Sequence, residues 1–157
     1  MTKVKATQPF VLIAQARLQF KINCIFVFIN YLMMKNIEIE ATHYTPYVHF
    51  DFTNGLFEMK GISKPEDSNA FYLPLIDWIT KYAKNPKPKT EVHIHLRYFN
   101  TSSMKQLLVV FRIFETILEA GNDTIIYWMY ESDDEEMLEA GCDFQSIVDV
   151  PFIMEEI

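Results

Sequence analysis

The chain has 157 residues, half of them apolar and 15% aromatic, which suffices for one domain with a packed core. Its formal net charge of −7 argues against a nucleic-acid partner, because neutralising phosphates needs a basic surface. The two cysteines, Cys24 and Cys142, form neither a CxxC pair nor a disulfide framework, so we expect free thiols in a reducing, cytoplasmic compartment.

The first 33 residues differ from the rest, because they contain four basic residues and no acidic one. Ile22–Met34 is an apolar run broken by two asparagines, too short for a membrane span, which needs about 20 residues. A basic start before an apolar stretch is also typical of signal peptides, but no small-x-small cleavage site follows. The sequence therefore favours a start at Met33 or Met34, with an added helix or a targeting segment as alternatives. It predicts a single domain over residues 34–157.

The predicted domain begins with paired strands and a helix. Residues 37–40 and 48–52 alternate apolar and polar side chains, which predicts two strands. Asn54-Gly55 predicts a tight turn into an antiparallel return strand over residues 56–61. After a loop, we expect a helix that begins at Pro74, since proline suits the first turn of a helix. Its buried stripe is predicted at Phe71, Leu75, Trp78, Ile79 and Tyr82.

Thr90–Phe99 is the clearest strand of the sequence, and a helix follows it. Strict alternation predicts that His93, His95 and Arg97 share one face, and that the other face holds Val92, Ile94, Leu96 and Tyr98. The next apolar residues recur at helical spacing, and this helix is expected to end at Gly121-Asn122 with a left-handed cap.

The last third of the chain predicts a strand, a short helix and a final strand. Thr124–Tyr130 is almost continuously apolar, which indicates a central strand covered on both faces. The acidic run Glu131–Glu136 precedes a short helix that is expected to end near Ala140, before Gly141. Phe152–Met154 is the last predicted strand.

This order of elements predicts an α/β fold. Strands connected by helices become parallel neighbours through right-handed crossovers, so we expect a small mixed β-sheet with an N-terminal antiparallel hairpin and flanking helices. Functional loops of such sheets lie beyond the carboxyl ends of the parallel strands. Asn100–Ser103 and Glu131–Glu136 both follow such ends, so they should share one edge of the molecule.

The turn Asn100–Ser103 places an amide and three hydroxyls at the entry of a helix. Ser103 with Gln106 matches a capping box, and Asn100 or Thr101 could cap the helix instead. One cap needs only one such residue, so a phosphoacceptor is the alternative interpretation. A phosphate here would lie near free backbone N–H groups and the positive end of the helix dipole. The residues alone favour capping.

The acidic run Glu131–Glu136 and two histidines are the other candidate sites. Hard cations bind carboxylates, but the spacing matches no EF-hand loop, and acids favour the first turn of a helix. If Thr101 lies nearby, this run would repel a phosphate, and the edge would rearrange or reject a bound partner. His93 and His95 lack a third ligand at a recognisable spacing. The sequence therefore predicts no metal site, no cofactor and no enzyme active site.

Several ordered motifs resemble the SiaC family of bacterial regulatory phosphoproteins. They are Gly61–Glu66, Phe71–Pro74 with Trp78, Tyr98–Ser103, Trp128–Tyr130, the acidic run with Glu139–Gly141, and Pro151-Phe152. The resemblance extends from Ile37 to the C-terminus and does not include residues 1–33. It implies a fold similar to that of anti-anti-sigma (STAS-type) domains.

The resemblance also implies a non-enzymatic switch. Thr101 would be the phosphoacceptor, modified by a dedicated protein kinase and reset by a metal-dependent serine/threonine phosphatase. The unphosphorylated form would bind and activate a diguanylate cyclase, which links the switch to cyclic-di-GMP signalling and biofilm formation. The expected switch and partner surface consists of Asn100, Ser102, Ser103, Asp133, Asp134 and Glu135.

Two rival functions stay open at this point. One is an anti-anti-sigma-like protein whose partner is an anti-sigma kinase that controls transcription. The other is a metal-dependent enzyme that uses the acidic run 131–136 and the histidines. Neighbouring genes would separate the first rival from a cyclase regulator, and the metal content of the purified protein would test the second.

Overall fold

The structure is a computed structural model that describes residues 13, 15–22, 25 and 34–157. The chain divides into two compact units, Met1–Met34 and Lys35–Ile157. The described residues 13, 15–22 and 25 of the first unit are helical. Most of segment 1–33 lies outside the described residues, so its interpretation as upstream translation, an added helix or a targeting segment stays a prediction. Among the helices that the structure describes, none is long and apolar enough to cross a membrane.

The second unit is built on one six-stranded mixed sheet, in which the strands follow one another in chain order. The strands are β1 (Ile37–Ile39), β2 (Tyr47–Asp51), β3 (Leu56–Ser63), β4 (Lys89–Phe99), β5 (Asp123–Tyr130) and β6 (Phe152–Glu156). The pairs β1–β2 and β2–β3 are antiparallel, whereas β3 to β6 run parallel. The predicted mixed sheet with an N-terminal antiparallel hairpin is confirmed.

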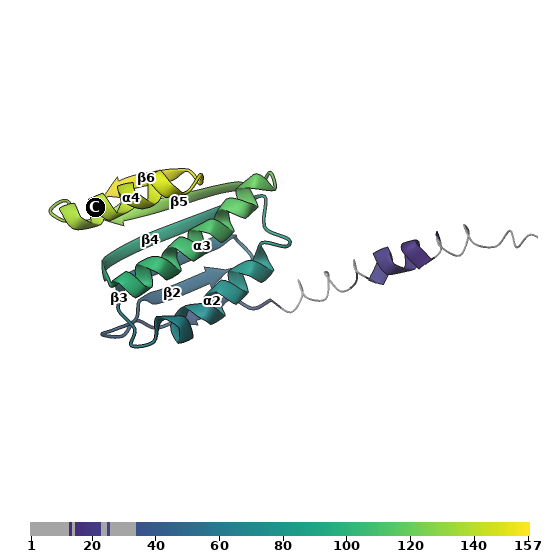
Figure 1. Ribbon diagram of the computed structural model, residues 1–157, viewed down its shortest axis with the longest axis horizontal. Helices are drawn as coiled ribbons and strands as arrows, with labels where there is room; N and C mark the ends of the chain where they lie inside the picture. The colour runs from purple at the N-terminus through teal and green to yellow at the C-terminus, as the bar shows by residue number, and fades with distance from the viewer. Residues whose placement is uncertain (1–12, 14, 23–24, 26–33) are drawn as a thin grey trace, which may run out of the picture. The chain divides into compact units, whose positions relative to one another are not determined.

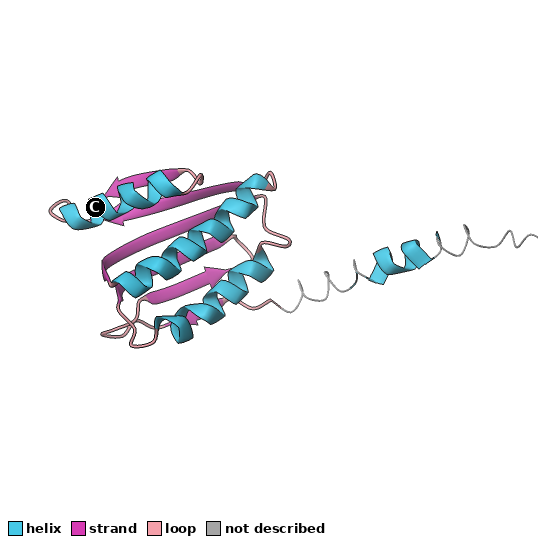
Figure 2. Ribbon diagram, viewed as in Figure 1, coloured by secondary structure: helices cyan, strands magenta, loops and turns pink. Residues whose placement is uncertain are grey.

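Three helices of this unit cover the same face of the sheet (Figures 1 and 2). They are α2 (Ser68–Tyr82), α3 (Thr101–Glu119) and α4 (Glu135–Ile147). Each helix connects one parallel strand to the next strand in the same direction, and right-handed crossovers then place all of them on one side. The core lies between the two layers and includes Trp78, which was predicted to be buried, and Trp128.

The hairpin between β2 and β3 forms at the predicted Asn54-Gly55 turn. The Oδ1 atom of Asp51 accepts hydrogen bonds from the N–H groups of Thr53 at 2.8 Å and Asn54 at 3.3 Å. Gly55 has a φ of 68°, and a Cβ added there would lie 2.6 Å from the carbonyl oxygen of Lys89. Glycine is therefore required both by the backbone conformation and by the close approach of β4.

Helix α2 begins six residues before the predicted start. Asp67 is the N-cap, and its Oδ1 accepts the N–H of Ala70 at 2.9 Å. The expected start at Pro74 was wrong, because this cap already closes the first turn and Pro74 lies inside the helix. Tyr72 occupies the first buried position of the stripe, while Phe71 is only half-buried.

A bulge near the end of β4 reverses the predicted alternation of its side chains. Leu96 pairs with Gly61 and Tyr98 with Ile62, so one extra residue stands in β4 between the two pairs. Tyr98 is therefore 49% exposed, and Phe99 packs against Trp128 with ring centroids 6.1 Å apart. The expectation that Tyr98 shares a face with Val92, Ile94 and Leu96 was wrong, because a bulge shifts the side chains that follow it to the other face.

β5 lies between β4 and β6, as predicted for a central strand. Its buried residues alternate with half-buried ones, which include Ile125, Tyr127 and Met129. None of α2, α3 and α4 covers the face to which these half-buried residues belong (Figure 1). The prediction of cover on both faces was therefore wrong, because all three crossover helices lie on the opposite side.

Helix α4 extends to Ile147, well beyond the predicted end near Ala140. Gly141 does not terminate the helix but lies inside it, because its missing side chain lets the helix approach the sheet. A Cβ added at Gly141 would lie 2.5 Å from Trp128 Cδ1 and 2.5 Å from Met154 Cε. The glycine is thus a packing feature rather than a helix stop.

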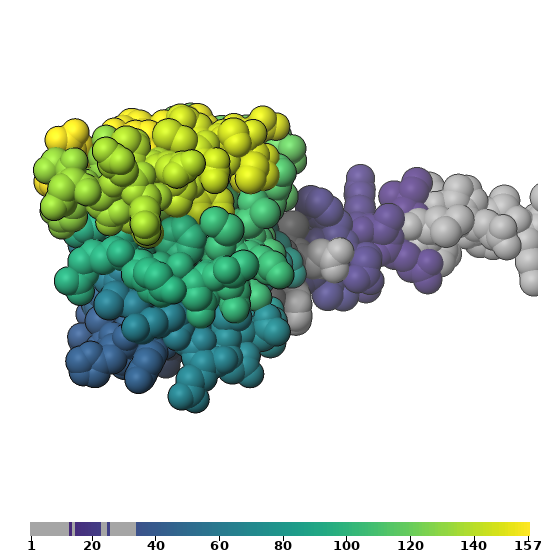
Figure 3. All heavy atoms as spheres, turned by 60° about the vertical axis from the view of Figure 1, so that its left-hand side comes forward, coloured from purple at the N-terminus to yellow at the C-terminus, as the bar shows by residue number. Residues whose placement is uncertain are grey.

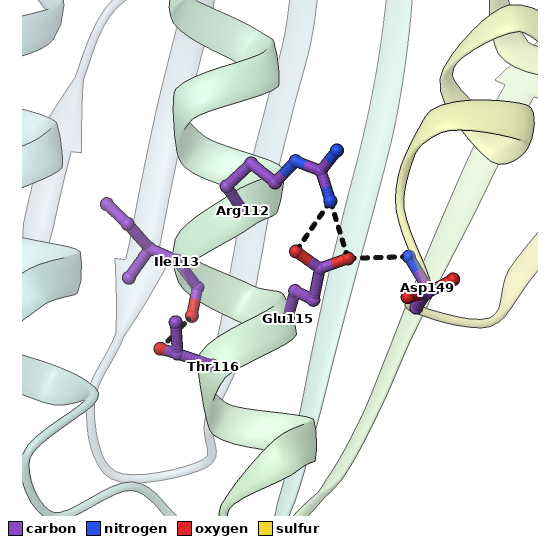
Figure 4. A network of polar contacts seen from close by, with 5 residues as sticks. All are labelled: Arg112, Ile113, Glu115, Thr116 and Asp149. Atoms are coloured by element: carbon purple, nitrogen blue, oxygen red, sulfur yellow. Dashed lines mark hydrogen bonds and ion pairs between the residues drawn. The ribbon is translucent and has the colours of Figure 1, made fainter.

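The connection from α4 to β6 is fixed to α3 by one carboxylate (Figure 4). Glu115 Oε1 accepts the backbone N–H of Asp149 at 2.7 Å. Both carboxylate oxygens of Glu115 lie 2.8 Å from Arg112 Nη1. These bonds lower the pKa of Glu115, with the bond from Arg112 as the largest cause. The carboxylate therefore holds the last segment of the chain in place.

Candidate functional site

The carboxyl ends of β3, β4 and β5 lie at one edge of the parallel part of the sheet, on the left in Figure 1. The segments that follow these strands begin at Lys64, Asn100 and Glu131. His95 Nε2 and Glu131 Oε1 are 3.6 Å apart, which joins β4 to the acidic run. The segments 100–103 and 131–136 thus share this edge, as expected. Figure 3 turns this side of the molecule toward the viewer and shows it as a continuous surface.

Asn100 is the residue that caps α3. Its backbone is extended, and its Oδ1 accepts the N–H of Ser103 at 2.8 Å. Gln106 does not complete a capping box, because its side-chain amide donates to Asn69 Oδ1 at 2.7 Å and joins α3 to α2. Of the capping alternatives left open by the sequence, the structure uses Asn100.

The three hydroxyls after the cap lie in two different environments. Thr101 and Ser102 are exposed, and neither hydroxyl makes a hydrogen bond to any residue that the structure describes. Ser103, which was expected on the switch and partner surface, is 0% exposed. Its position in the third residue of α3 turns it toward the sheet, so only Thr101 and Ser102 are open to a modifying enzyme.

Ser103 belongs to a buried group of hydroxyls beneath this turn. Ser63 Oγ lies 2.9 Å from Ser103 Oγ and 2.7 Å from the phenol oxygen of Tyr72. The three residues come from β3, α2 and α3. Satisfied buried hydroxyls fix the relative position of the elements that carry them, so this group holds the start of α3 against the sheet.

Tyr72 should make the stability of the fold fall at alkaline pH. Burial raises the pKa of Tyr72 from 10.0 to about 12, against the opposing effect of its bonds to Ser63 and Ser103. Between these values the folded state holds the phenol proton more tightly than the unfolded state, so the free energy of unfolding decreases as the pH rises. Urea unfolding of wild type and Tyr72→Phe at pH 9 to about 12 tests this. An equally steep loss of stability in both proteins would contradict the prediction.

The acidic run ends in the first turn of α4, where the helix dipole favours acidic residues. Asp134 is the N-cap, and its Oδ1 accepts the N–H of Met137 at 2.9 Å. Glu135 and Glu136 stand in the first turn, and Asp133 and Glu135 are exposed. Asp133 and Glu135 are thus surface charges, whereas Asp134 also has a structural role.

The histidines of β4 lie on the face of the sheet without helices. His93 stacks on Tyr127 with ring centroids 4.6 Å apart, and its Nε2 lies 3.9 Å from Glu91 Oε2. In the part of the chain that the structure describes, no group of three or more His, Cys, Asp and Glu side chains is arranged to hold a metal ion.

One feature of the edge was missed by the sequence interpretation. The Lys64 ammonium lies over the rings of Tyr44 and Tyr98. Neither the spacing of these residues nor their types signals this arrangement, because Tyr98 reaches the surface only through the bulge in β4.

Comparisons with known proteins agree with this fold. The family model described as SiaC family regulatory phosphoprotein matches residues 39–157. An uncharacterized protein of Pseudomonas aeruginosa strain UCBPP-PA14 is 27% identical over 122 residues, which cover 78% of this chain and 97% of that protein.

Two crystal structures from Pseudomonas aeruginosa are also similar. Apo-SiaC has a TM-score of 0.72 at 27% identity, covering 78% of this chain and 99% of the other. A chain in the complex of diguanylate cyclase SiaD with its activator SiaC has a TM-score of 0.74 at 26% identity, covering 77% and 99%. The chain described here therefore belongs to the SiaC family of regulatory phosphoproteins.

Proposed function

We propose that this regulatory protein activates a diguanylate cyclase and is switched off by phosphorylation of Thr101. The proposal places it in the cytoplasm, where such a cyclase would use it to control cyclic-di-GMP and biofilm formation. The observation that carries the proposal is the exposed Thr101 hydroxyl on the first residue of α3. The similarity to SiaC, which is named as the activator of SiaD in the complex structure, supports a cyclase as the partner.

The geometry of α3 suits a switch that leaves the fold intact. The Asn100 side chain already caps the helix by bonding the N–H of Ser103. A phosphate on Thr101 would lie at the positive end of the helix dipole, where negative charge is stabilising. Modification therefore changes the surface of the edge and does not break the helix beneath it.

The charges of the edge explain how a phosphate could reject a partner. Glu131, Asp133 and Glu135 are exposed at the end of the neighbouring strand and the start of α4. A phosphate adds about −1.5 to −2 charges at pH 7. A partner that fits the edge when Thr101 is unmodified would have no group to pair with this added charge, and burying an unpaired charge in an interface is costly. The unphosphorylated form is accordingly the active form in this proposal.

The enzymes that would set and reset the switch are a dedicated protein kinase and a metal-dependent serine/threonine phosphatase. Both need the hydroxyl to enter their active sites, and the exposure of Thr101 meets this need. Ser102 is also exposed, so accessibility alone does not determine whether Thr101 or Ser102 is phosphorylated. The resemblance of Asn100–Ser103 to the family motif favours Thr101.

Incubation with the cognate kinase should add one phosphate, and Thr101→Ala should abolish the addition, because no other position carries the motif. Intact mass spectrometry followed by peptide mapping measures both results. Ser102→Ala is the matched control, since it removes the other exposed hydroxyl of the turn and should still be modified. Modification of Ser102 instead, or of neither residue, would contradict the proposal.

A further inference from the structure

Lys64 lies at the edge that carries Thr101, and among the described residues it has no acidic partner. Its Nζ lies 5.6 Å from the ring centroid of Tyr44 and 5.9 Å from that of Tyr98. Among the described residues, no carboxylate lies within ion-pair distance of this ammonium. Tyr44 and Tyr98 are 56% and 49% exposed, so the arrangement lies at the surface. We call Tyr44, Lys64 and Tyr98 the tyrosine–lysine clamp.

Backbone hydrogen bonds hold the clamp beside the phosphoacceptor. The carbonyl oxygen of Ser63, the residue before Lys64, accepts the N–H of Asn100 at 3.0 Å. The N–H of Lys64 in turn donates to the carbonyl oxygen of Tyr44 at 2.8 Å. Lys64 is thereby fixed next to Asn100, one residue before Thr101. Its long, flexible side chain can turn from the tyrosine rings toward that position without any movement of the sheet.

We propose that Lys64 binds the phosphoryl group on Thr101 and leaves the rings of Tyr44 and Tyr98 to do so. The proposal rests on the proposed function, because it takes Thr101 as the phosphoacceptor. A phosphate dianion offers the ammonium charge-assisted hydrogen bonds, which are stronger than cation–π contacts at an exposed site. Because no carboxylate of the part of the chain that the structure describes pairs with Lys64, the ammonium is available for this exchange.

Phosphorylation would therefore change two properties of the edge. It would add negative charge at the start of α3, and it would expose the faces of Tyr44 and Tyr98 that the ammonium now covers. Exposed tyrosine rings are common contact residues in protein interfaces. A partner that contacts the clamp would distinguish the two states by the shape of this aromatic surface as well as by charge.

Lys105 is the competing ligand for the phosphate. It stands four residues after Thr101 on α3 and is exposed, and side chains at this spacing meet on a helix surface. The bond from Asn100 to Ser63 favours Lys64, because it fixes the Lys64 backbone beside the modified turn. The experiment must therefore determine whether Lys64 or Lys105 binds the phosphate.

The test uses protein with phosphothreonine installed at position 101 during translation, so that no kinase is needed. Phosphorus NMR over a pH series measures the second pKa of the phosphate in wild type, Lys64→Gln, Lys105→Gln and Lys84→Gln. Loss of a nearby cation disfavours the dianion, so Lys64→Gln should raise this pKa by roughly 0.3 to 0.5 unit. Lys84→Gln is the charge-matched control, because Lys84 follows the far end of α2, and should leave it unchanged.

A second readout follows the rings directly. The aromatic proton resonances of Tyr44 and Tyr98 should shift between unmodified and phosphorylated wild type, and the shift should be absent in Lys64→Gln. The proposal is overturned if Lys64→Gln leaves the phosphate titration unchanged, or if Lys105→Gln moves it more. Failure of the kinase to modify Thr101 would instead refute the proposed function, and the NMR result on the installed phosphothreonine would still decide the role of Lys64.

Discussion

Replacing Thr101 by glutamate should weaken binding to the cognate diguanylate cyclase by about tenfold or more, which corresponds to about 1.4 kcal/mol. The substitution places a permanent negative charge on the first residue of α3, at the edge that also carries Glu131 and Asp133. A charge for which the partner has no opposing group is buried unpaired in the complex, which costs binding energy. The fold should be unchanged, because a carboxylate in the first turn of a helix is favourable. Calorimetric titration with the cyclase measures the affinity.

Thr116→Glu is the matched control for this substitution. Thr116 is exposed on the same helix, 15 positions further along, or about 22 Å along the axis. Thr116→Glu makes the same change of charge far from the edge, so the affinity of this variant for the cyclase should match that of wild type. Enzymatically phosphorylated protein should bind more weakly than Thr101→Glu, since a phosphate carries more charge than a carboxylate. Equal affinity of wild type, Thr101→Glu and the phosphorylated protein would refute the switch.

Gly141→Ala should lower the free energy of unfolding by about 1–3 kcal/mol, the usual cost of overpacking a well-filled core. The added methyl group would lie 2.5 Å from Trp128 Cδ1 and 2.7 Å from Trp128 Nε1. Trp128 is only 1% exposed, and its indole N–H donates to the carbonyl oxygen of Met137 at 2.9 Å. The ring therefore cannot move aside without losing a buried hydrogen bond. Urea unfolding followed by circular dichroism measures the change.

The sign of the change in the free energy of unfolding distinguishes the effect of packing from that of helix propensity. In an exposed helix position, Gly→Ala stabilises by up to about 1 kcal/mol. Cys142→Ala is the control, because Cys142 is the next residue of α4 and is exposed, so its unfolding should match wild type. A Gly141→Ala protein as stable as wild type, or more stable, would show that the contact between α4 and Trp128 is not tight.

The order of the elements could be predicted from local patterns, because each pattern reports the periodicity of its own segment. The alternation in Thr90–Phe99 and the Asn54-Gly55 turn both specify structure within a few residues. The helix start at Pro74 could not be placed correctly, since α2 tolerates this proline in its interior and the competing cap at Asp67 stands seven residues earlier. Local sequence patterns cannot choose between two helix starts when both are compatible with the same segment.

The candidate site was predicted only in part. The turn Asn100–Ser103 was located at the correct edge, because the carboxyl ends of parallel strands meet there. Which residue caps α3, and which hydroxyl is buried, depended on contacts from distant segments. Ser103 lies in a buried group in which Ser63 of β3 bonds to Ser103 and Tyr72 of α2 bonds to Ser63. No pattern near Ser103 contains that information.

The sequence by itself determined the α/β class, the order of strands and helices, and the turn that carries Thr101, because periodicity and turn chemistry are local properties. Only the tertiary structure decided which side chains of the turn are accessible and which charges lie around them. The bulge in β4 moves Tyr98 to the surface beside Lys64. Because these two residues are far apart in the sequence, their contact could not be predicted from it. Accessibility and contacts between distant residues arise only when the strands pair and the helices pack.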